Sequence, residues 1–274
     1  MFWYLNIATN NLSGEVPSLS SIPSLSDLEI NDNDFSGPFL SLSTNPLLQF
    51  FLINNNRFSG QIPDFSATPL LQNLLAHNND FSSTVFPALF DLNNITNIML
   101  SGNVNLKGTL PAVFFSPSLL ALVIEGCKLT GPLPTNITSP LESFYLAGNF
   151  FTSFIPSLPP TIIDVSLAYN QFSGSIPDSF FSNTPNLNSF DVRHNDIGGS
   201  IPTSLSYLTN LVDLKLDLNN FSGVISSDIS TWPIFAANDT NNTILFGNLW
   251  ACPLPDIVRE HSDEDPGHAY SCAG

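Results

Sequence analysis

NRFSGQIP, residues 56–63, is a motif that recurs along the chain and decides its fold. It reads Asn, any residue, Leu or Phe, any residue, Gly, any residue, an aliphatic residue and Pro. It returns as NNLSGEVP from Asn10, NQFSGSIP from Asn170 and NDIGGSIP from Asn195, with altered copies in between. Successive copies lie 21 to 25 residues apart, with reference positions at Asn10, Asn33, Asn56, Asn79, Asn103, Cys127, Asn149, Asn170, Asn195 and Asn219. A period this regular predicts a solenoid of about ten repeats.

Apolar residues recur eight, five and three positions before each reference Asn, for example Leu25, Leu28 and Ile30 before Asn33. Because side chains alternate along a strand, the last two should point inward, and the residues between and beside them should point outward. We therefore expect one short strand per repeat in a parallel sheet, with neighbouring strands about 4.8 Å apart. A single repeat cannot bury its own apolar side, so stability must come from stacking on its neighbours.

The reference Asn ends each strand, and its amide is expected to bond to the backbone of the turn. The predicted ladder consists of Asn10, Asn33, Asn56, Asn79, Asn103, Asn149, Asn170, Asn195 and Asn219. Cys127 interrupts it, and because a thiol bonds weakly, that turn should lose some hydrogen bonding. The fifth copy carries one extra residue, which moves its apolar Leu106 from two to three positions after the Asn. Gly follows four positions after most reference residues, where it permits a tight backbone path, but Ser83 and Ser153 replace it in two copies.

The complete pattern, LxxLxLxxNxLxGxIPxxLxxL, resembles the plant-type leucine-rich repeat of receptor-kinase ectodomains, receptor-like proteins and polygalacturonase-inhibitor-like proteins. The resemblance covers roughly residues 2–225. It implies an α/β-type solenoid, a curved right-handed superhelix with the parallel sheet on its concave side and a second short strand near the xLxG segment. It also implies non-enzymatic recognition of a peptide, protein or small ligand on the inner surface.

The domain boundaries follow from the same alignment of copies. Residues 1–225 hold ten repeats, and residues 226–274 hold a degenerate last repeat and a cysteine-bearing cap. Phe2, Leu5 and Ile7 already occupy repeat positions, so we expect that an N-terminal cap is missing and that Met1 is not the natural start. No basic region followed by an apolar targeting stretch is visible before them, so the sequence predicts no signal peptide within these residues.

Cys252 and Cys272 lie in a tail that resembles the cap following extracellular repeat arrays. A disulfide between them would close a loop of about 20 residues and contribute roughly 3 kcal/mol, and it requires an oxidising compartment. Sequons at Asn11 and Asn220 arise from the repeat itself, whereas those at Asn94, Asn136, Asn238 and Asn241 are predicted glycosylation sites in return loops or the tail. These features favour an extracellular or cell-surface location. The sequence contains no run of about 18 apolar residues, so it predicts no membrane span.

A net charge of −17 argues against nucleic acid and anionic membranes as partners. No spacing of His, Cys and acidic residues matches a metal site, and no cofactor is expected. Acidic residues on adjacent strands could do glycosidase chemistry, but an open, solvated sheet offers no burial to raise a carboxyl pKa. We therefore expect no enzymatic activity.

One outward position, four residues before the reference Asn, is apolar in five consecutive copies: Leu52, Leu75, Met99, Val123 and Tyr145. These side chains should be exposed, since their inward neighbours fill the core, and Phe50 adjoins them. Over four strand spacings they form a stripe roughly 19 Å long. Such a patch usually marks an interaction surface, although drift or cover by a loop is the alternative.

The two ends of this surface are polar, with Asp27, Glu29 and Asp32 at the N-terminal end. The predicted ligand-binding set on the concave face is Phe50, Leu52, Leu75, His77, Met99, Val123, Tyr145, Asp191, Arg193, Asp213 and Lys215. The apolar centre would anchor a protein or peptide ligand and the charged ends would set its position. The alternatives are a secreted inhibitor of a cell-wall-degrading enzyme and an ice-binding protein, the latter because Ser or Thr recurs three positions after most reference residues.

Overall fold

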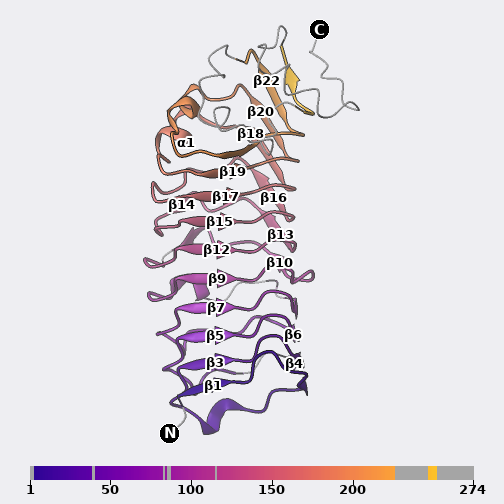
Figure 1. Cartoon of the computed structure of the whole chain (residues 1–274), viewed down its shortest axis with the longest axis vertical. Helices are drawn as coiled ribbons and strands as arrows, with labels where there is room; N and C mark the ends of the chain where they lie inside the picture. The colour runs from indigo at the N-terminus through magenta and orange to yellow at the C-terminus, as the bar shows by residue number, and fades with distance from the viewer. Residues whose placement is uncertain are drawn as a thin grey trace.

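The computed structural model describes residues 3–38, 41–82, 84, 88–114, 116–225 and 246–251. Within these residues the chain is an elongated stack of strands that climbs steadily from the N-terminal to the C-terminal end (Figure 1). One strand from each repeat joins a ten-stranded parallel sheet in the order β1-β3-β5-β7-β9-β12-β15-β17-β19-β21. The predicted solenoid with a parallel sheet is therefore confirmed.

Each strand of this sheet is three residues long, and from β3 onward its central residue is buried. The strands are β1 Tyr4–Asn6, β3 Asp27–Glu29, β5 Phe50–Leu52, β7 Asn73–Leu75, β9 Asn97–Met99, β12 Ala121–Val123, β15 Ser143–Tyr145, β17 Asp164–Ser166, β19 Ser189–Asp191 and β21 Asp213–Lys215. The alternation places one column of side chains in the core and two columns on the outer face, as the two-residue period predicts.

The second strand of each repeat, implied by the resemblance, is present and forms two further parallel sheets. The four-stranded sheet contains β2 Ser13–Gly14, β4 Asp34–Pro38, β6 Arg57–Gly60 and β8 Asp80–Phe81. The seven-stranded sheet contains β10 Lys107–Gly108, β13 Lys128–Gly131, β16 Phe150–Ser153, β18 Gln171–Ser175, β20 Asp196–Gly199, β22 Asn220–Gly223 and β23 Leu249–Trp250. They are separated at the fifth repeat, which carries the extra residue.

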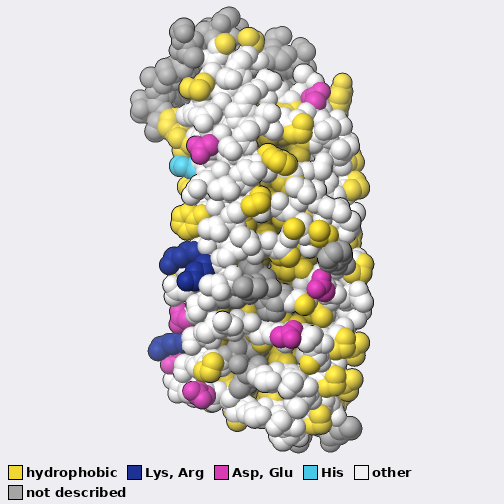
Figure 2. Space-filling model, turned by 180° about the vertical axis from the view of Figure 1, so that it is seen from behind, with side chains coloured by type: hydrophobic (Ala, Val, Ile, Leu, Met, Phe, Trp, Pro, Cys, Tyr) yellow, Lys and Arg dark blue, Asp and Glu magenta, His cyan; other side chains and the backbone are white. Residues whose placement is uncertain are grey.

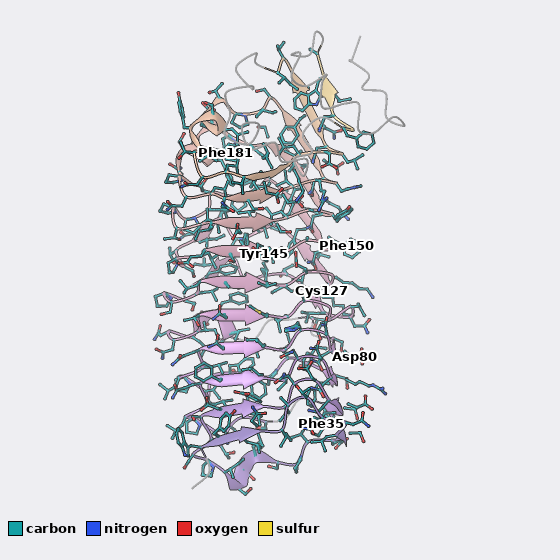
Figure 3. All side chains as sticks on the ribbon, viewed as in Figure 1. Phe35, Asp80, Cys127, Tyr145, Phe150 and Phe181 are labelled. Carbon is teal, nitrogen blue, oxygen red and sulfur yellow. The ribbon has the colours of Figure 1, made fainter. Side chains whose placement is uncertain are left out.

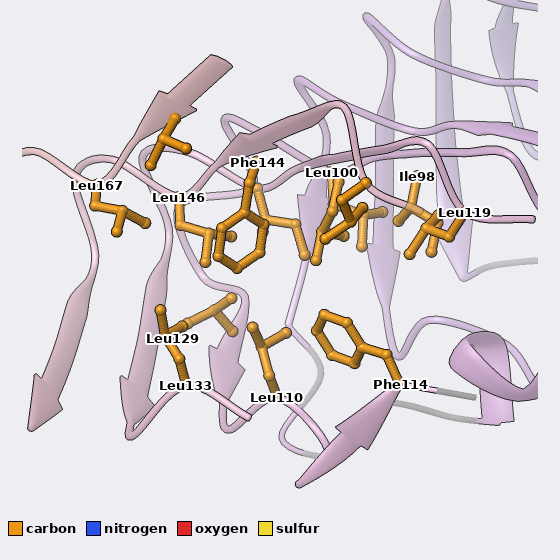
Figure 4. Packing of buried hydrophobic residues seen from close by; sticks show 14 of the residues in the cluster. Ile98, Leu100, Leu110, Phe114, Leu119, Leu129, Leu133, Phe144, Leu146 and Leu167 are labelled. Carbon is orange, nitrogen blue, oxygen red and sulfur yellow. The ribbon is translucent and has the colours of Figure 1, made fainter. Parts of the chain in front are cut away.

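The return segments hold little regular structure in the described residues. They contain the helix α1 Asp178–Ser182, the 3₁₀ turns η1 Leu19–Ser21, η2 Ala88–Asp91 and η3 Thr203–Tyr207, and the strand pair β11 Val113–Phe114 and β14 Asn136–Ile137. The core lies between these segments and the sheets. Figure 4 shows Phe144 and Leu146 facing Leu110 and Leu129 across it, all at most 5% exposed.

In the apolar column two positions after the reference residue, phenylalanine rings of neighbouring repeats stack on each other. Phe35 and Phe58 stack with ring centroids 6.3 Å apart, and Phe151 and Phe172 stack at 6.2 Å. Because each ring contacts the ring of the next repeat, burial is shared between repeats and no repeat is stable alone.

The ladder asparagines join each repeat to the preceding one. The amide of Asn56 donates to the carbonyls of Ile53 (3.2 Å) and Ile30 (2.9 Å), and its Oδ1 accepts from the N–H of Phe35 (3.0 Å). The same two bonds to the preceding repeat are made by Asn33, Asn79, Asn103, Asn149, Asn170, Asn195, Asn219 and Asn248. Asn10 bonds to the carbonyls of Ile7 and Ala8 in its own turn.

Cys127 interrupts the ladder, but the backbone N–H that an Asn at this position would bind still has a hydrogen-bond acceptor. Its thiol lies 3.6 Å from the carbonyl oxygen of Leu100 and 3.5 Å from that of Glu125. The N–H that would need an Asn oxygen belongs to Leu106, and it donates instead to the carbonyl of Asn103 at 2.8 Å. The extra residue in the fifth repeat thus supplies a local acceptor, which makes an Asn at 127 unnecessary. Burial also raises the pKa of the Cys127 thiol to about 11, so the thiol stays protonated at neutral pH.

Restoring the ladder residue should therefore not stabilise the protein. We expect Cys127→Asn to lower the free energy of unfolding by about 1 kcal/mol, because the new carbonyl oxygen is buried without a donor. The reverse change, Asn149→Cys, should cost about 1–3 kcal/mol, because it strips the acceptor from the N–H of Leu129. Urea unfolding of both variants measures this, and a clear gain in stability for Cys127→Asn would contradict the account.

Ser153 adopts a backbone conformation that favours glycine, with φ of 74°, at a position where other repeats carry Gly. Ser153→Gly should raise the free energy of unfolding by roughly 0.5–1 kcal/mol, because it removes left-handed strain. Gly174→Ser in the next repeat, φ +81°, is the matched reverse change, since an added Cβ would meet only Phe154 Cβ at an ordinary 3.6 Å. Thermal melts of both variants should shift in opposite directions, and shifts of the same sign would disprove the strain argument.

Candidate functional site on the outer face of the ten-stranded sheet

The five apolar residues of the predicted stripe form one continuous row across the sheet. Leu52 lies opposite Leu75, Leu75 opposite Met99, Met99 opposite Val123, and Val123 opposite Tyr145. Each is the last residue of its strand and points away from the buried central residue. We call these five residues the apolar row; Figure 3 labels Tyr145, its last member, on this sheet.

The residues of the apolar row are half-buried, whereas the sequence predicted full exposure. The reason is lateral: side chains on strands about 4.8 Å apart cover one another's flanks, so only their tips reach solvent. Phe50, the first residue of β5, is also half-buried and lies opposite Asp27 and Asn73. The row is therefore a packed apolar surface with a polar margin beside it.

His77 follows β7 on the same face and holds an unused hydrogen-bonding atom. Its Nδ1 is buried and has no hydrogen-bond partner among the described residues. Burial lowers the pKa of this imidazole, although the charge of Asp32 acts in the opposite direction. His77 is thus neutral at pH 7, and its half-buried ring lies on the same face as the apolar row.

The N-terminal end of the face is a network of amides and carboxylates. Asn6 donates to the Glu29 carboxylate at 2.6 Å. Asn78 donates to Asn55 at 2.8 Å, and Asn55 donates to Asp32 at 2.6 Å, so a side-chain row crosses three repeats. These groups satisfy one another.

The predicted charged residues at the C-terminal end are brought together as two ion pairs on adjacent strands. Arg193 Nη2 lies 3.0 Å from Asp191, and Lys215 Nζ lies 2.8 Å from Asp213. Ser189 donates to Asp213 at 3.1 Å. Asp191 is buried, and this burial raises its pKa while the Arg193 N–H and guanidinium act against the rise.

Two carboxylates beside Tyr145 were missed by the sequence analysis. Ser166 donates to Glu125 Oε1 at 3.2 Å, so Glu125 reaches across the strand that carries Tyr145. Burial raises the pKa of Glu125, and the charge of Asp191 adds to the rise. Burial also raises the pKa of Asp164 and of Tyr145. The expectation that this sheet is too solvated to shift a carboxyl pKa is therefore wrong at its C-terminal end.

A third feature missed by the sequence analysis is a column of left-handed residues just before the ladder. Tyr169 and His194 both have φ of 54°, and their rings stack with centroids 4.2 Å apart. The Arg193 guanidinium lies 5.8 Å from the centre of the Tyr169 ring. The signal in the sequence was the Gly, Asn or Asp at this position in other repeats, which tolerate such a conformation.

The remaining predicted sites have varied positions. Asn94 and Asn136 are exposed, and the Asn94 amide donates to the carbonyl of Pro69 at 2.9 Å. Cys252, Cys272, Asn238 and Asn241 lie outside the described residues. In the part of the chain that the structure describes, no cluster of three or more His, Cys, Asp or Glu could hold a metal ion. No described helix has the length and apolar character to cross a membrane.

Known proteins share this repeat and this fold. A family model described as Leucine Rich Repeat matches residues 186–208. Receptor-like protein 35 of Arabidopsis thaliana is 32% identical over 142 residues, which are 50% of this chain and 15% of that protein. This chain therefore corresponds to a small part of that relative.

Solved structures match nearly the whole chain. A TDR receptor structure superposes with a TM-score of 0.80 and 28% identity, over 94% of this chain and 45% of the receptor chain. The ectodomain of the Arabidopsis receptor kinase HAESA, solved with a peptide hormone ligand, gives a TM-score of 0.77 and 26% identity, over 93% of this chain and 47% of that one. Together with the recurring motif and the stacked parallel sheets, these similarities support a plant-type leucine-rich repeat protein.

Proposed function

We propose that this chain is a non-enzymatic recognition module that binds a protein or peptide on the outer face of its ten-stranded sheet, the face expected to be concave. The observation that carries the proposal is the apolar row, five consecutive strands that each present an apolar tip at the same position. A monomeric scaffold has no need of such a row, because its core is already filled by the inward column.

The chemistry of the face suits a ligand with an apolar middle. Side chains from the ligand would remove the half-exposed tips of the apolar row from water, and this burial would supply most of the affinity. The half-buried ring of His77 would widen the contact surface, and the ion pairs of Asp191 and Asp213 would set the direction of the ligand. The peptide-hormone complex of the HAESA ectodomain supports a peptide as the ligand class.

The setting that we propose is the cell surface or the extracellular space, as part of a receptor-like protein. The similarity to receptor-like protein 35 and to receptor ectodomains supports this setting. Asn94 and Asn136 are exposed, so glycans on both would be accommodated by solvent.

Acidic substitutions in the apolar row should abolish binding. Peptides selected from a displayed random library against the full chain provide a probe without knowledge of the natural ligand. We expect the double variant Leu75→Asp, Met99→Asp to lose at least about ten-fold in affinity for the selected peptides, since it places charge at the centre of the apolar contact. Fluorescence anisotropy with labelled peptides measures the change.

The matched control is the double variant Leu47→Asp, Leu70→Asp. Both leucines are exposed and lie in the return segments that precede β5 and β7, so the same charge is added to the same or an adjoining repeat, away from the face. This control should bind as the parent does. Equal affinity for the parent and the apolar-row variant, with both folded by circular dichroism, would refute the proposed face.

The partly desolvated carboxylate of Glu125 predicts a pH-dependent effect. Because the folded-state pKa of Glu125 is raised, its ionisation lowers stability as the pH rises above the unfolded value, which is about 4.3. Glu125→Gln keeps the acceptor for Ser166 and removes this cost. Urea unfolding should show equal free energies of unfolding for variant and parent below about pH 4, where Glu125 is protonated in both states. At about pH 7 the variant should be the more stable protein.

The exposed Glu142 supplies the comparison for this experiment. Glu142→Gln makes the same change in net charge and should alter stability little at either pH. If Glu125→Gln gains no more stability at pH 7 than Glu142→Gln, then Glu125 is fully solvated and the desolvation argument fails.

A further inference from the structure

Two lysines on the seven-stranded sheet form no ion pair with any described residue, although the chain is strongly acidic. The sequence has 6 Lys and Arg against 23 Asp and Glu. Among the described cationic residues, Arg57, Arg193 and Lys215 each form an ion pair, at 2.6, 3.0 and 2.8 Å. Lys107 and Lys128 form none with any described carboxylate. Among the described residues, the cations without an ion pair are therefore these two neighbouring lysines, although acidic side chains are abundant in the chain.

These two lysines lie directly opposite each other. Lys107 in β10 is the strand partner of Lys128 in β13, and both are exposed. The polar contact of Lys128 is with Asn105 Oδ1, at 3.4 Å. Figure 2 shows Lys and Arg side chains gathered at one margin of the molecule (dark blue), on an otherwise mostly uncharged surface. Like charges on facing strand positions repel, and an anion bound between them would relieve the repulsion.

An exposed aromatic ring adjoins the lysine pair. Phe150 opens the next strand, β16, and pairs with Thr130, two residues after Lys128. Phe150 is 46% exposed. Figure 3 shows it on the side of the solenoid formed by the second strands, away from the ten-stranded sheet. Phe154, four residues later, is 54% exposed. The flank therefore offers positive charge and apolar surface side by side.

Carboxylates limit this positive region on both sides. Asp34 in β4 and Asp80 in β8 lie on the N-terminal side, and Asp196 in β20 lies on the C-terminal side. The positive stretch is therefore two strands wide, about 5 Å between strand axes. A long polyanion would extend over these carboxylates and be repelled by them, whereas a segment with two carboxylates is short enough to lie between them.

We propose that Lys107, Lys128 and Phe150, which we call the flank patch, dock a short segment of a partner protein in which two carboxylates adjoin an aromatic or aliphatic side chain. The carboxylates pair with the two ammonium groups, and the apolar side chain packs on Phe150. The flank patch lies on a different sheet from the apolar row, so it serves a second partner or a second part of the same partner.

Lysine NMR tests this directly, because the chain contains only three lysines, Lys107, Lys128 and Lys215. Reductive ¹³C-methylation of the full chain gives one signal for each, assigned from the signal that disappears in K107R, K128R and K215R. The probe is acetyl-Gly-Ser-Asp-Glu-Phe-Ser-Gly-amide, with an Asn/Gln version of the same peptide as the neutral comparison. We expect the acidic peptide to shift the Lys107 and Lys128 signals saturably, to leave Lys215 unchanged, and to act less as salt is raised.

Charge-matched variants complete the test. K107Q with K128Q should weaken binding of the acidic peptide about five-fold or more, as expected for the loss of two exposed ion pairs, and F150A should weaken it separately. R57Q, on the neighbouring four-stranded sheet, changes the charge in the same sense as each Lys→Gln substitution and should leave binding unchanged. All four substituted side chains are exposed, so the melting temperature of each variant should stay near that of the parent. This measurement shows that the variants are folded.

Three results would overturn the proposal. The first is that the acidic peptide shifts the Lys107 and Lys128 signals no more than the Lys215 signal, or no more than the neutral peptide shifts them. The second is tighter saturation of the same signals by oligogalacturonate than by the peptide, which would make the ligand a polysaccharide. The third is a shift of these signals with protein concentration alone, which would make the occupant a second copy of this chain.

Discussion

The hydrogen bond from the backbone N–H of one repeat to the Asn oxygen of the next is the interaction on which the rest of the structure depends. It joins Phe35 to Asn56 and Phe58 to Asn79 with nearly identical lengths of 3.0 Å. Because both groups are buried, loss of either one leaves an unsatisfied polar atom in the core. The bond therefore fixes the spacing of the turns, and through them the lateral alignment of every strand above and below.

Alignment of this kind explains why the surface is organised in rows. Once the ladder places Leu52 opposite Leu75, the same offset places Met99, Val123 and Tyr145 in line without further information. The outward residues make no bonds in the ladder, so they change without cost to the scaffold. The chemistry of the surface is thus free to vary at these positions while the buried columns are held constant by packing.

The sequence was sufficient to predict the scaffold because each repeat states the same pattern. The two-residue alternation identified Leu28 and Ile30 as core, and both are at most 1% exposed. The position of the apolar row followed from the same alignment, but its half-burial did not, since burial depends on neighbours on adjacent strands. Periodicity assigns a face to a residue, and only packing assigns its exposure.

The features that escaped prediction share a cause: they join residues from different columns of the repeat. Glu125 accepts a hydrogen bond from Ser166, which lies two strands away in the sheet. The compensation at Cys127 requires the backbone route of an insertion in the preceding repeat, at Leu106. Neither relation is visible when copies are aligned one above another.

The residue before each ladder residue adopts a left-handed backbone conformation, which is strained wherever that residue is not glycine. At the position before the ladder residue, Gly102, Gly126 and Gly148 adopt the left-handed conformation without cost, whereas Tyr169, His194 and Leu218 adopt it at about 1–2 kcal/mol each. The cost is tolerated because backbone bonds hold these residues, including that from the Tyr169 N–H to the Arg193 carbonyl at 2.9 Å. In return Tyr169 and His194 stack on the surface, between the charged end of the ten-stranded sheet and the neighbouring flank. The ladder thus determines where side chains stand, and repeats in the C-terminal half carry bulky residues at a position where glycine would fit best.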